Sequence, residues 1–538
     1  MNKKTFKQRL DSFFKISENG SSFKVEIIAG IATFLAMSYI LTVNPNQILY
    51  AGSADPNWAS VFIATAFGAV VGTILMSLYA KMPLAQASGM GLNSMLGGII
   101  GGGVGAFAYN IEYSLPQALF LVFISGLIFL LFSIVPLGKN KETGKWVTLR
   151  EKIYDGMPEC IRKAIPVGIG LFIAFIGLQN AKIVSANQYT LVEFVDLTKI
   201  FTGSLRYDIV DPITGAVTGQ ALYNYTYAIV AFVSFFAIVI LSHFKVKGSV
   251  IFGVLIGTIV AIPLGVTNID ILLGNAEGSG VTWKFWESFG SYFSKDGLFL
   301  SVFTEGMKLP EGSLITSIML IITFCMIDMF DTMGTVVGCA TNAGLLDEDG
   351  KPLNYNKIMI SDSIATVAGS MFGTSTVTTF VESGTGIAAG GKTGFASLIT
   401  TILFILSIFL LPVFAFIPSA AAAGALIYVG VLMMQNVKNI DFSSIKLAAT
   451  SFLTIIMMVL TYSITKGIGI GVIAYVVMTV VSNLLVGIKY LFAKDKSTAE
   501  KPVWDISIVL WVVFVLFLIY FIVPTEWVSI FRPPFAAA

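Results

Sequence analysis

The chain has 538 residues, of which 56% are hydrophobic and 12% are charged, and its net charge is +2. Soluble domains carry about 25% charged residues, so this composition excludes a soluble enzyme and a disordered chain, and the near-neutral charge offers no basic surface for nucleic acid. The single histidine and the three scattered cysteines, which lack CxxC spacing, support neither a metal site nor a disulfide framework. We therefore expect an all-α polytopic membrane protein with no cofactor.

The first 24 residues are polar and basic, and the apolar run that follows is too far along the chain and too long for a cleavable signal peptide. Fourteen segments have the length or the apolar character of membrane spans. Eleven are long and apolar: 25–48, 57–80, 116–137, 164–182, 223–243, 248–266, 312–340, 393–417, 419–436, 444–465 and 468–491. Three are short, glycine-rich or interrupted by polar residues: 84–105, 359–373 and 376–391. A fifteenth apolar run, 504–523, follows a charged linker and has no assigned place.

Charge placement predicts the topology. With the N-terminus in the cytosol, most of the 33 lysine and arginine residues fall in segments predicted to be cytosolic, as the positive-inside rule requires. We therefore expect a multi-pass protein of the cell membrane in five parts. These are a cytosolic segment 1–24, a seven-span repeat 25–266, an extracytoplasmic loop 267–311, a second seven-span repeat 312–491, and 492–538, which holds a linker, an additional hydrophobic segment and the C-terminus.

Two short patterns recur in the two predicted halves. The sequence SGMGL at 88–92 corresponds to SGTGI at 383–387, and Thr33-Phe34 corresponds to Thr323-Phe324, two spans earlier each time. Seven spans separate the copies, and an odd number inverts the second copy in the membrane. Inverted repeats with glycine-interrupted segments are typical of secondary transporters, whose binding sites lie at those segments.

The interrupted segments predict a strand followed by a half-helix. The stretch MFGTSTVTTFVE at 371–382 is rich in Thr, Val and Phe and precedes a glycine cluster, and the same order appears at 84–98. Extended backbone at membrane depth is tolerated only inside protein or along a cavity. We expect the half-helix ends at Gly89, Gly91, Ser383 and Gly384 to present backbone amides to that cavity. The alternative is that these glycines only allow close helix packing.

Three carboxylates lie inside predicted spans. Asp328 and Asp331 are three residues apart and share a helix face, and Glu382 sits at the strand-to-helix junction. Intramembrane acids cost at least about 2.5 kcal/mol each and usually mark a pathway or a binding site, although any one of them can instead cap a helix. Asp362 stands at the predicted start of a span, and we interpret it as an N-cap.

These acids suit a planar base. A carboxylate accepts two hydrogens from the N–H edge that a purine offers, and it can take a proton, which makes it a natural coupling group. Phe380 is placed to stack on a flat ring, although phenylalanine is also a common lipid-facing residue here. The segment from Gly386 to Thr393 also fits the P-loop pattern GxxxxGK[ST]. The helix after it is a continuous apolar span, so we interpret Lys392 as a cytosolic anchor instead.

Four motifs, MFDTMGT, ESGTGIAAGGKTG, ASGMGLN and AMSYILTVNP, resemble the adenine/guanine/hypoxanthine permease branch of the nucleobase–ascorbate transporters, also called nucleobase:cation symporters. The resemblance covers nearly the whole chain. It implies a fourteen-span 7+7 inverted repeat with core and gate domains, a homodimer, and elevator-like, proton-coupled uptake of purine bases. By motif position, Asn93, Asp328 and Glu382 would contact the substrate, and Asp331 would support binding or coupling. The QxExxGD pattern of the xanthine/urate branch is absent.

The sequence thus predicts a secondary transporter, not an enzyme, that imports hypoxanthine, guanine and adenine by proton symport. Glu382 would bind the edge of the base, Asp328 would bind or gate from a facing helix, Asn93 would hold the opposite edge, and Phe380 would stack. Protonation of Asp328 or Glu382 would favour the moving state, because a neutral acid is cheaper to bury than a charged one. An anion carrier, such as a sulfate carrier of the same inverted-repeat fold, is the alternative.

Overall fold

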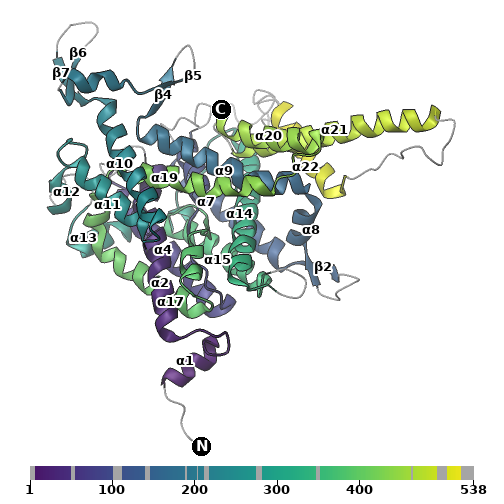
Figure 1. The fold of residues 1–538 in the computed structure, drawn as a ribbon, viewed down its shortest axis with the longest axis horizontal. Coiled ribbons are helices and arrows are strands. Elements are labelled where there is room, and N and C mark those ends of the chain that lie inside the picture. The colour runs from purple at the N-terminus through teal and green to yellow at the C-terminus, as the bar shows by residue number, and fades with distance from the viewer. Residues whose placement is uncertain are drawn as a thin grey trace, which may run out of the picture. The chain divides into compact units, whose positions relative to one another are not determined.

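The computed structural model describes residues 6–49, 55–100, 112–139, 146–187, 191–202, 204–210, 217–246, 248–273, 281–346, 352–461, 464–492 and 506–522. The fold is predominantly helical (Figure 1). Within these residues, nine helical segments are long and apolar enough to cross a membrane. They are Phe23–Ile48, Trp58–Ala80, Leu115–Ile134, Glu159–Asn180, Asn224–His243, Thr316–Val337, Gly394–Ala415, Ser419–Asn439 and Lys466–Tyr490.

Several of these segments contain more than one helix. The composite ones are α2 (Phe23–Met37) with α3 (Ile40–Ile48), α4 (Trp58–Leu75) with the π-helix η2 (Met76–Ala80), α17 (Gly394–Ser407) with η5 (Ile408–Leu410) and α18 (Leu411–Ala415), and α19 (Ser419–Met434) with η6 (Gln435–Asn439). The others are α7 (Leu115–Ile134), α9 (Glu159–Asn180), α10 (Asn224–His243), α14 (Leu314–Ala343) and α21 (Ile464–Phe492). The first predicted span is therefore interrupted next to Tyr39, which places that side chain at a helix junction.

The remaining elements are shorter. The helices are α1 (Phe6–Phe14), α5 (Met90–Ile99), α8 (Leu149–Gly156), η3 (Leu197–Thr202), α11 (Ser249–Ala261), α12 (Ile269–Leu273), α13 (Phe285–Tyr292), η4 (Ser301–Phe303), α15 (Tyr355–Phe372), α16 (Ser383–Ala388), α20 (Ile445–Leu460) and α22 (Ile508–Ile522). The strands form four antiparallel pairs: β1 (Gln86–Ser88) with β8 (Val377–Thr379), β2 (Pro136–Lys139) with β3 (Trp146–Thr148), β4 (Val184–Asn187) with β5 (Leu191–Phe194), and β6 (Arg206–Val210) with β7 (Val217–Leu222). The unplaced apolar run is the helix α22.

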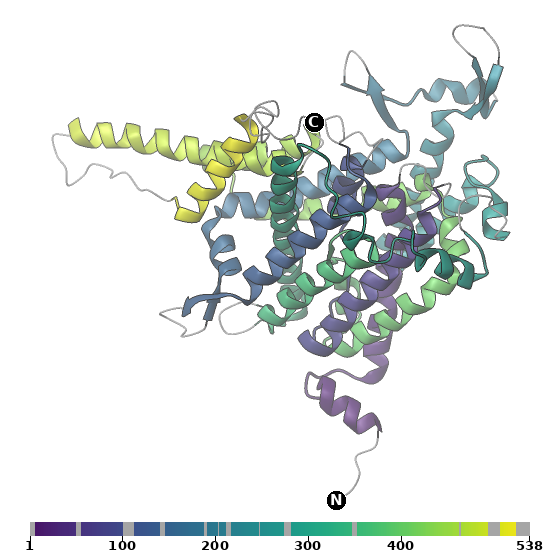
Figure 2. The same ribbon diagram turned by 180° about the vertical axis from the view of Figure 1, so that it is seen from behind.

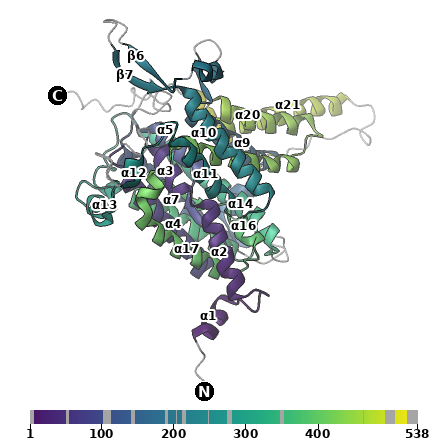
Figure 3. The same cartoon turned by 60° about the vertical axis from the view of Figure 1, so that its left-hand side comes forward.

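The chain forms two compact units that alternate along the sequence. The first unit comprises residues 1–127, 173–309 and 332–429. In it α2, α4 and α17 lie side by side (Figure 3), and α15 packs on α4. Glycine permits the closest approaches, since a methyl group on Gly30 would lie 2.4 Å from the carbonyl oxygen of Ala396, and one on Gly394 would lie 2.3 Å from that of Ser77.

The second unit comprises residues 128–172, 310–331 and 430–538. In it α20 packs along α21, and α22 also packs on α21 (Figure 2). A methyl group on Gly471 would lie 2.0 Å from Thr454 Oγ1, so the close contact between α20 and α21 requires glycine there. Ser507 Oγ donates to the carbonyl oxygen of Gly156 at 2.7 Å and joins the start of α22 to the end of α8.

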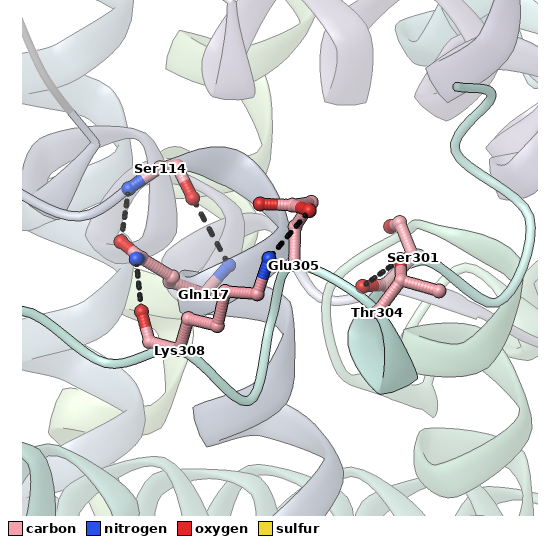
Figure 4. Close-up of polar contacts among 6 residues, drawn as sticks. All are labelled: Ser114, Gln117, Ser301, Thr304, Glu305 and Lys308. Atoms are coloured by element: carbon pink, nitrogen blue, oxygen red, sulfur yellow. Dashed lines mark hydrogen bonds and ion pairs between the residues drawn. The ribbon is translucent and has the colours of Figure 1, made fainter.

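The segment 301–308 is tied to the start of α7 by polar contacts (Figure 4). The side-chain amide of Gln117 donates to the carbonyl oxygen of Lys308, and its Oε1 accepts from the backbone N–H of Ser114 at 2.9 Å. Lys308 Nζ also pairs with Glu305 Oε1 at 3.1 Å. That ion pair is exposed and adds little stability, so the link between this segment and α7 is the hydrogen bond from Gln117 to the backbone of Lys308.

Candidate functional site

Two segments far apart in the sequence meet through β1 and β8. The pair is antiparallel, with Gln86 opposite Thr379 and Ser88 opposite Val377. The pairing continues at both ends, because Gly89 N donates to the carbonyl oxygen of Thr376 at 2.9 Å and Phe380 N donates to that of Ala85 at 3.0 Å. A half-helix follows each strand, α5 after β1 and α16 after β8. These are the two strand-plus-helix segments that the sequence predicts.

Glu382 is the buried acid at the start of α16. Its side chain is 5% exposed, and its Oε1 accepts a hydrogen bond of 2.6 Å from the hydroxyl of Tyr39. The same hydroxyl lies 3.4 Å from Met90 Sδ, on the first residue of α5. Tyr39 therefore connects the starts of both half-helices. The other carboxylate oxygen, Oε2, is buried and has no hydrogen-bond partner among the described residues.

Asn93 lies in α5 at the centre of a hydroxyl network. Its Oδ1 accepts from Ser88 Oγ at 2.9 Å and from the hydroxyl of Ser375. Ser88 Oγ is also 3.1 Å from Thr374 Oγ1, which accepts from Asn44 Nδ2 at 2.8 Å. All five side chains are fully buried. The network fixes Asn93 against β1 and the segment before β8, while its Nδ2 makes only a long contact of 3.4 Å to the carbonyl oxygen of Ser88.

The backbone N–H groups at the starts of the two half-helices have different hydrogen-bond partners. In α16, the N–H of Ser383 donates to the carbonyl oxygen of Phe380, and that of Gly384 donates to Val381. In α5, Asn93 N donates to the carbonyl oxygen of Gly89, closing the first turn. Helix geometry then directs the preceding amides, including that of Gly91, out of the N-terminal end. Of the four amides expected to face a cavity, those of Gly89, Ser383 and Gly384 donate to backbone carbonyls instead, and that of Gly91 lies in the first turn of α5.

Open space lies at Gly384, two residues after Glu382. A methyl group added to Gly384 would meet no atom within 4 Å, whereas one added to Gly386 would lie 2.1 Å from Thr33 Oγ1. Phe380 is buried and precedes Glu382 by two residues. Because side chains alternate along extended backbone, Phe380 and Thr378 lie on one face of the β1–β8 pair, and Val377 and Thr379 lie on the other.

Asp328 and Asp331 belong to the second unit. They lie one turn apart in α14, as their spacing predicts. Asp328 is 1% exposed, and Asp331 is half-buried. The structure therefore brings together Gly89, Asn93, Phe380, Ser383 and Glu382 in the first unit, and it places the two aspartates on α14.

The interpretation of Asp362 as an N-cap is wrong. The helix α15 begins at Tyr355 with Asn354 as its N-cap, so Asp362 lies in the helix interior. Its carboxylate is fully buried and accepts from Gln86 Nε2 at 2.6 Å. The apolar run that marked the start of this span begins after the helix does, because the first turn of α15 is polar.

A further buried carboxylate, that of Glu26, binds the backbone of the P-loop-like segment. The side chain of Glu26 in α2 accepts from the backbone N–H groups of Lys392 at 3.0 Å, Thr393 at 3.3 Å and Ala396 at 3.2 Å. It also accepts from Thr393 Oγ1 at 2.8 Å. The amides at the start of α17 thus form an anion-binding turn that the chain fills with its own carboxylate, and a phosphate group would have to displace Glu26.

One further cavity lies away from these residues, at the strands β4 to β7. It has a volume of about 340 Å³ and is lined by Ser185, Glu193, Phe194, Val195, Asp196, Lys199, Tyr207, Tyr223, Asn224 and Tyr225. Asp196 in its wall is already bonded to Thr198 and paired with Lys199. Within the described part of the chain, no group of three or more His, Cys, Asp or Glu side chains is arranged to hold a metal ion.

Sequence reasoning did not assign a role to Tyr39, Gln86 or Glu26. Tyr39 lies inside the AMSYILTVNP motif, so the motif marked the segment but not the hydroxyl. Glu26 stands in the first turn of an apolar helix, and its intramembrane charge was the signal available. Gln86 gave no signal by itself, because a neutral amide is common at helix ends and in loops.

Comparison with known proteins gives a consistent result. Residues 24–470 match the model of the permease family Xan_ur_permease. The chain is 34% identical to the guanine/hypoxanthine permease PbuG of Bacillus subtilis, over 95% of this chain and 99% of that protein. It is 33% identical to the adenine permease AdeQ of Escherichia coli, over 88% of this chain and 90% of that protein.

Among solved structures, the transmembrane domain of a cyanobacterium bicarbonate transporter, BicA, has a similar fold. The TM-score is 0.51 at 18% sequence identity, and the match covers 84% of this chain and 97% of that domain. At this identity the likeness concerns the fold alone.

Proposed function

The chain belongs to the permease family, and on that premise we propose that it imports purine nucleobases (hypoxanthine, guanine and adenine) by proton symport. The observation that carries this proposal is the carboxylate of Glu382, which is buried, held through Oε1 by Tyr39 and open at Oε2. Relatives named as guanine/hypoxanthine and adenine permeases support the substrate class.

The geometry suits a flat ring with N–H groups on one edge. Glu382 Oε2 accepts from that edge, and the space beside Gly384 leaves room for the ring. The outward amides of α5, including that of Gly91, donate to a carbonyl or ring nitrogen on the other side. In this proposal Asn93 uses its weakly engaged Nδ2 for the same edge, and Phe380 stacks on the ring.

Tyr39 sets the orientation of the acid. A carboxylate with one oxygen bound by a hydroxyl cannot rotate freely, so Oε2 points in one direction before the ligand arrives. Such pre-organisation lowers the ordering cost of binding. A ligand that satisfies Oε2 also removes the penalty of leaving a buried acceptor without a partner, about 1–3 kcal/mol.

Proton coupling is assigned to Asp328, Asp331 and Glu382. A buried carboxylate costs far less when it is neutral, so protonation of Glu382 or Asp328 favours the loaded state that moves. The transporter is further proposed to have fourteen spans in a 7+7 inverted repeat, with core and gate domains and elevator-like alternating access. We place it as a homodimer in the cell membrane with its N-terminus in the cytosol.

An anion carrier is the weaker candidate. The fold is shared with a bicarbonate transporter, but fold does not determine the ligand. A carboxylate at the start of α16 repels an anion, and the N–H groups of Ser383 and Gly384 already donate to the chain's own carbonyls. The site therefore favours a neutral ligand with N–H donors.

The test is uptake of labelled hypoxanthine, guanine and adenine by cells that lack their own carriers. We expect uptake of at least one base, and its loss with Glu382→Gln, which keeps the shape but removes the charge. Glu305→Gln is the matched control, because the side chain of Glu305 is 65% exposed and lies in a connecting segment. No uptake of any base refutes the function, and full uptake by Glu382→Gln refutes the site.

A second experiment identifies the coupling ion. Vesicles that contain the purified protein are given a pH gradient alone or a sodium gradient alone. The proposal predicts accumulation of the base with the pH gradient only. Accumulation that follows the sodium gradient would contradict proton symport while leaving the substrate assignment intact.

A further inference from the structure

The β1–β8 pair has two different faces. Thr378 and Phe380 lie on the face assigned to the substrate, while Val377 and Thr379 face α4 and α15. A methyl group on Gly72 of α4 would lie 3.0 Å from Val377 Cγ1, and one on Gly369 of α15 would lie 2.6 Å from Val377 Cγ2. The rear face of the pair is therefore packed against two helices without a gap.

A carboxylate is inserted into this packed face. Asp362 Oδ1 accepts from Gln86 Nε2 at 2.6 Å and from Thr379 Oγ1 at 3.3 Å. Gln86 Nε2 also donates to Thr379 Oγ1 at 3.2 Å. Gln86 and Thr379 are directly opposite each other in the strand register, so a single oxygen of α15 binds both strands at the same position.

The strands need such support. Each has three residues, and an isolated two-stranded pair is marginal. Thr379 also connects the pair to α14, because its backbone N–H lies 3.4 Å from Thr332 Oγ1 and donates to it. Hydrogen bonds to a charged group are worth more than those between neutral groups, so a carboxylate at this position can contribute more than the hydroxyl contacts of Thr73 and Thr366 to the same strands.

We propose that Asp362 is a positioning residue for transport: with Gln86 and Thr379 it forms a clamp that fixes β1 against β8 and thereby aligns the start of α5 with Glu382. This inference rests on the proposed function. In the proposed function, Asp362 does not touch the substrate. The clamp acts through the register of β1 against β8. The helix α5 follows β1 and Glu382 follows β8, so this register sets the position of the first-turn amides of α5 relative to Glu382.

The test separates positioning from simple structural support. Asp362→Asn replaces the charged acceptor with an amide, and we expect the KM for the base to rise roughly tenfold, the loss of one hydrogen bond to a charged group, with a smaller change in Vmax per molecule at the surface. The Gln86→Glu, Asp362→Asn double variant exchanges the amide and the carboxylate between the two positions. It should restore the KM to within about threefold of wild type, because one donor again faces one charged acceptor.

Thr379→Val keeps the branched shape in the strand and removes one donor, so it tests the clamp even if both Asp362 variants fail to fold. We expect it to raise the KM in the same direction. The proposal is overturned if the double variant is no better than Asp362→Asn, or if a folded Thr379→Val leaves the KM unchanged.

Thermal unfolding of the purified variants without ligand keeps this test distinct from that of the proposed function. The melting temperature should fall in Asp362→Asn and recover in the double variant, even if the wild type transports no purine. A melting temperature that does not recover contradicts the clamp itself. Recovery together with an unchanged KM shows structural support only and overturns the positioning role.

Discussion

Two glycines of α16 have opposite surroundings, and this contrast gives a sharp prediction. A methyl group at Gly384 meets no atom within 4 Å, whereas one at Gly386 would lie 2.1 Å from Thr33 Oγ1 and 2.7 Å from the carbonyl oxygen of Ala29. A backbone carbonyl in the middle of α2 cannot move aside as a flexible side chain can. Gly386→Ala therefore forces α16 away from α2.

The two substitutions should change the stability of the protein in opposite directions. Overpacking of a close contact costs about 1–3 kcal/mol, so Gly386→Ala should lower the melting temperature and the yield of folded protein. Gly384→Ala should be neutral or slightly stabilising, because alanine is favoured over glycine by about 1 kcal/mol inside a helix. Thermal unfolding of the purified protein measures both, and the two variants control for each other.

The same pair separates stability from function. Gly384→Leu puts a larger side chain at a position where a methyl group meets no atom within 4 Å, two residues after Glu382. If the base binds there as proposed, the protein should fold and lose most of its purine uptake. The reasoning is refuted if Gly386→Ala melts at the wild-type temperature. It is equally refuted if Gly384→Leu folds and transports at the wild-type rate.

Three other substitutions test the contacts around the site. Tyr39→Phe removes the donor to Glu382 Oε1, which should weaken base binding roughly tenfold and also lower the melting temperature, because a buried acceptor loses its partner. Unchanged affinity of the folded variant in a titration with labelled base would contradict the orienting role. Glu26→Gln replaces the acceptor of four hydrogen bonds at the start of α17 and should lower the melting temperature more than Glu305→Gln does, since a buried charged acceptor is lost. Equal melting temperatures would show that the turn needs no anion. Asn93→Ala removes the centre of the hydroxyl network and should reduce both stability and uptake, and uptake at the wild-type level would remove Asn93 from the site.

Much of the fold follows from local sequence. Each long apolar run contains a helix, because a span needs about 20 apolar residues. The β-branched run before Glu382 predicts the strand β8, and the glycine clusters after both strands mark where the half-helices begin. The predicted locations depended on composition within single segments, which is why they could be read without the structure.

The contacts of the site could not be predicted in this way. Tyr39 and Glu382 are 343 positions apart, and Gln86 and Asp362 are 276 apart. No local sequence pattern identifies partners that are so far apart in the chain. Equating SGMGL with SGTGI also hid a difference in conformation, since Ser88 ends a strand while Ser383 begins a helix. Three residues separate β8 from α16, but only Gly89 separates β1 from α5.

The hydrogen-bond partners of the backbone N–H groups at the half-helix starts also depend on the fold. The glycine patterns suggested free donors at both half-helix ends, but the turn that leads into α16 bends back on itself and uses the N–H groups of Ser383 and Gly384. In the proposed site, Glu382 is therefore the principal ligand group on that side, and the backbone donors come from α5.

Binding of labelled hypoxanthine to the purified protein, without any gradient, tests the role of Glu382 most directly. The account predicts saturable binding by the wild type that unlabelled guanine or adenine displaces, and at least about tenfold weaker binding by Glu382→Gln, as expected when a hydrogen bond to a charged group is lost. Equal binding by the two proteins, with both correctly folded, would contradict it.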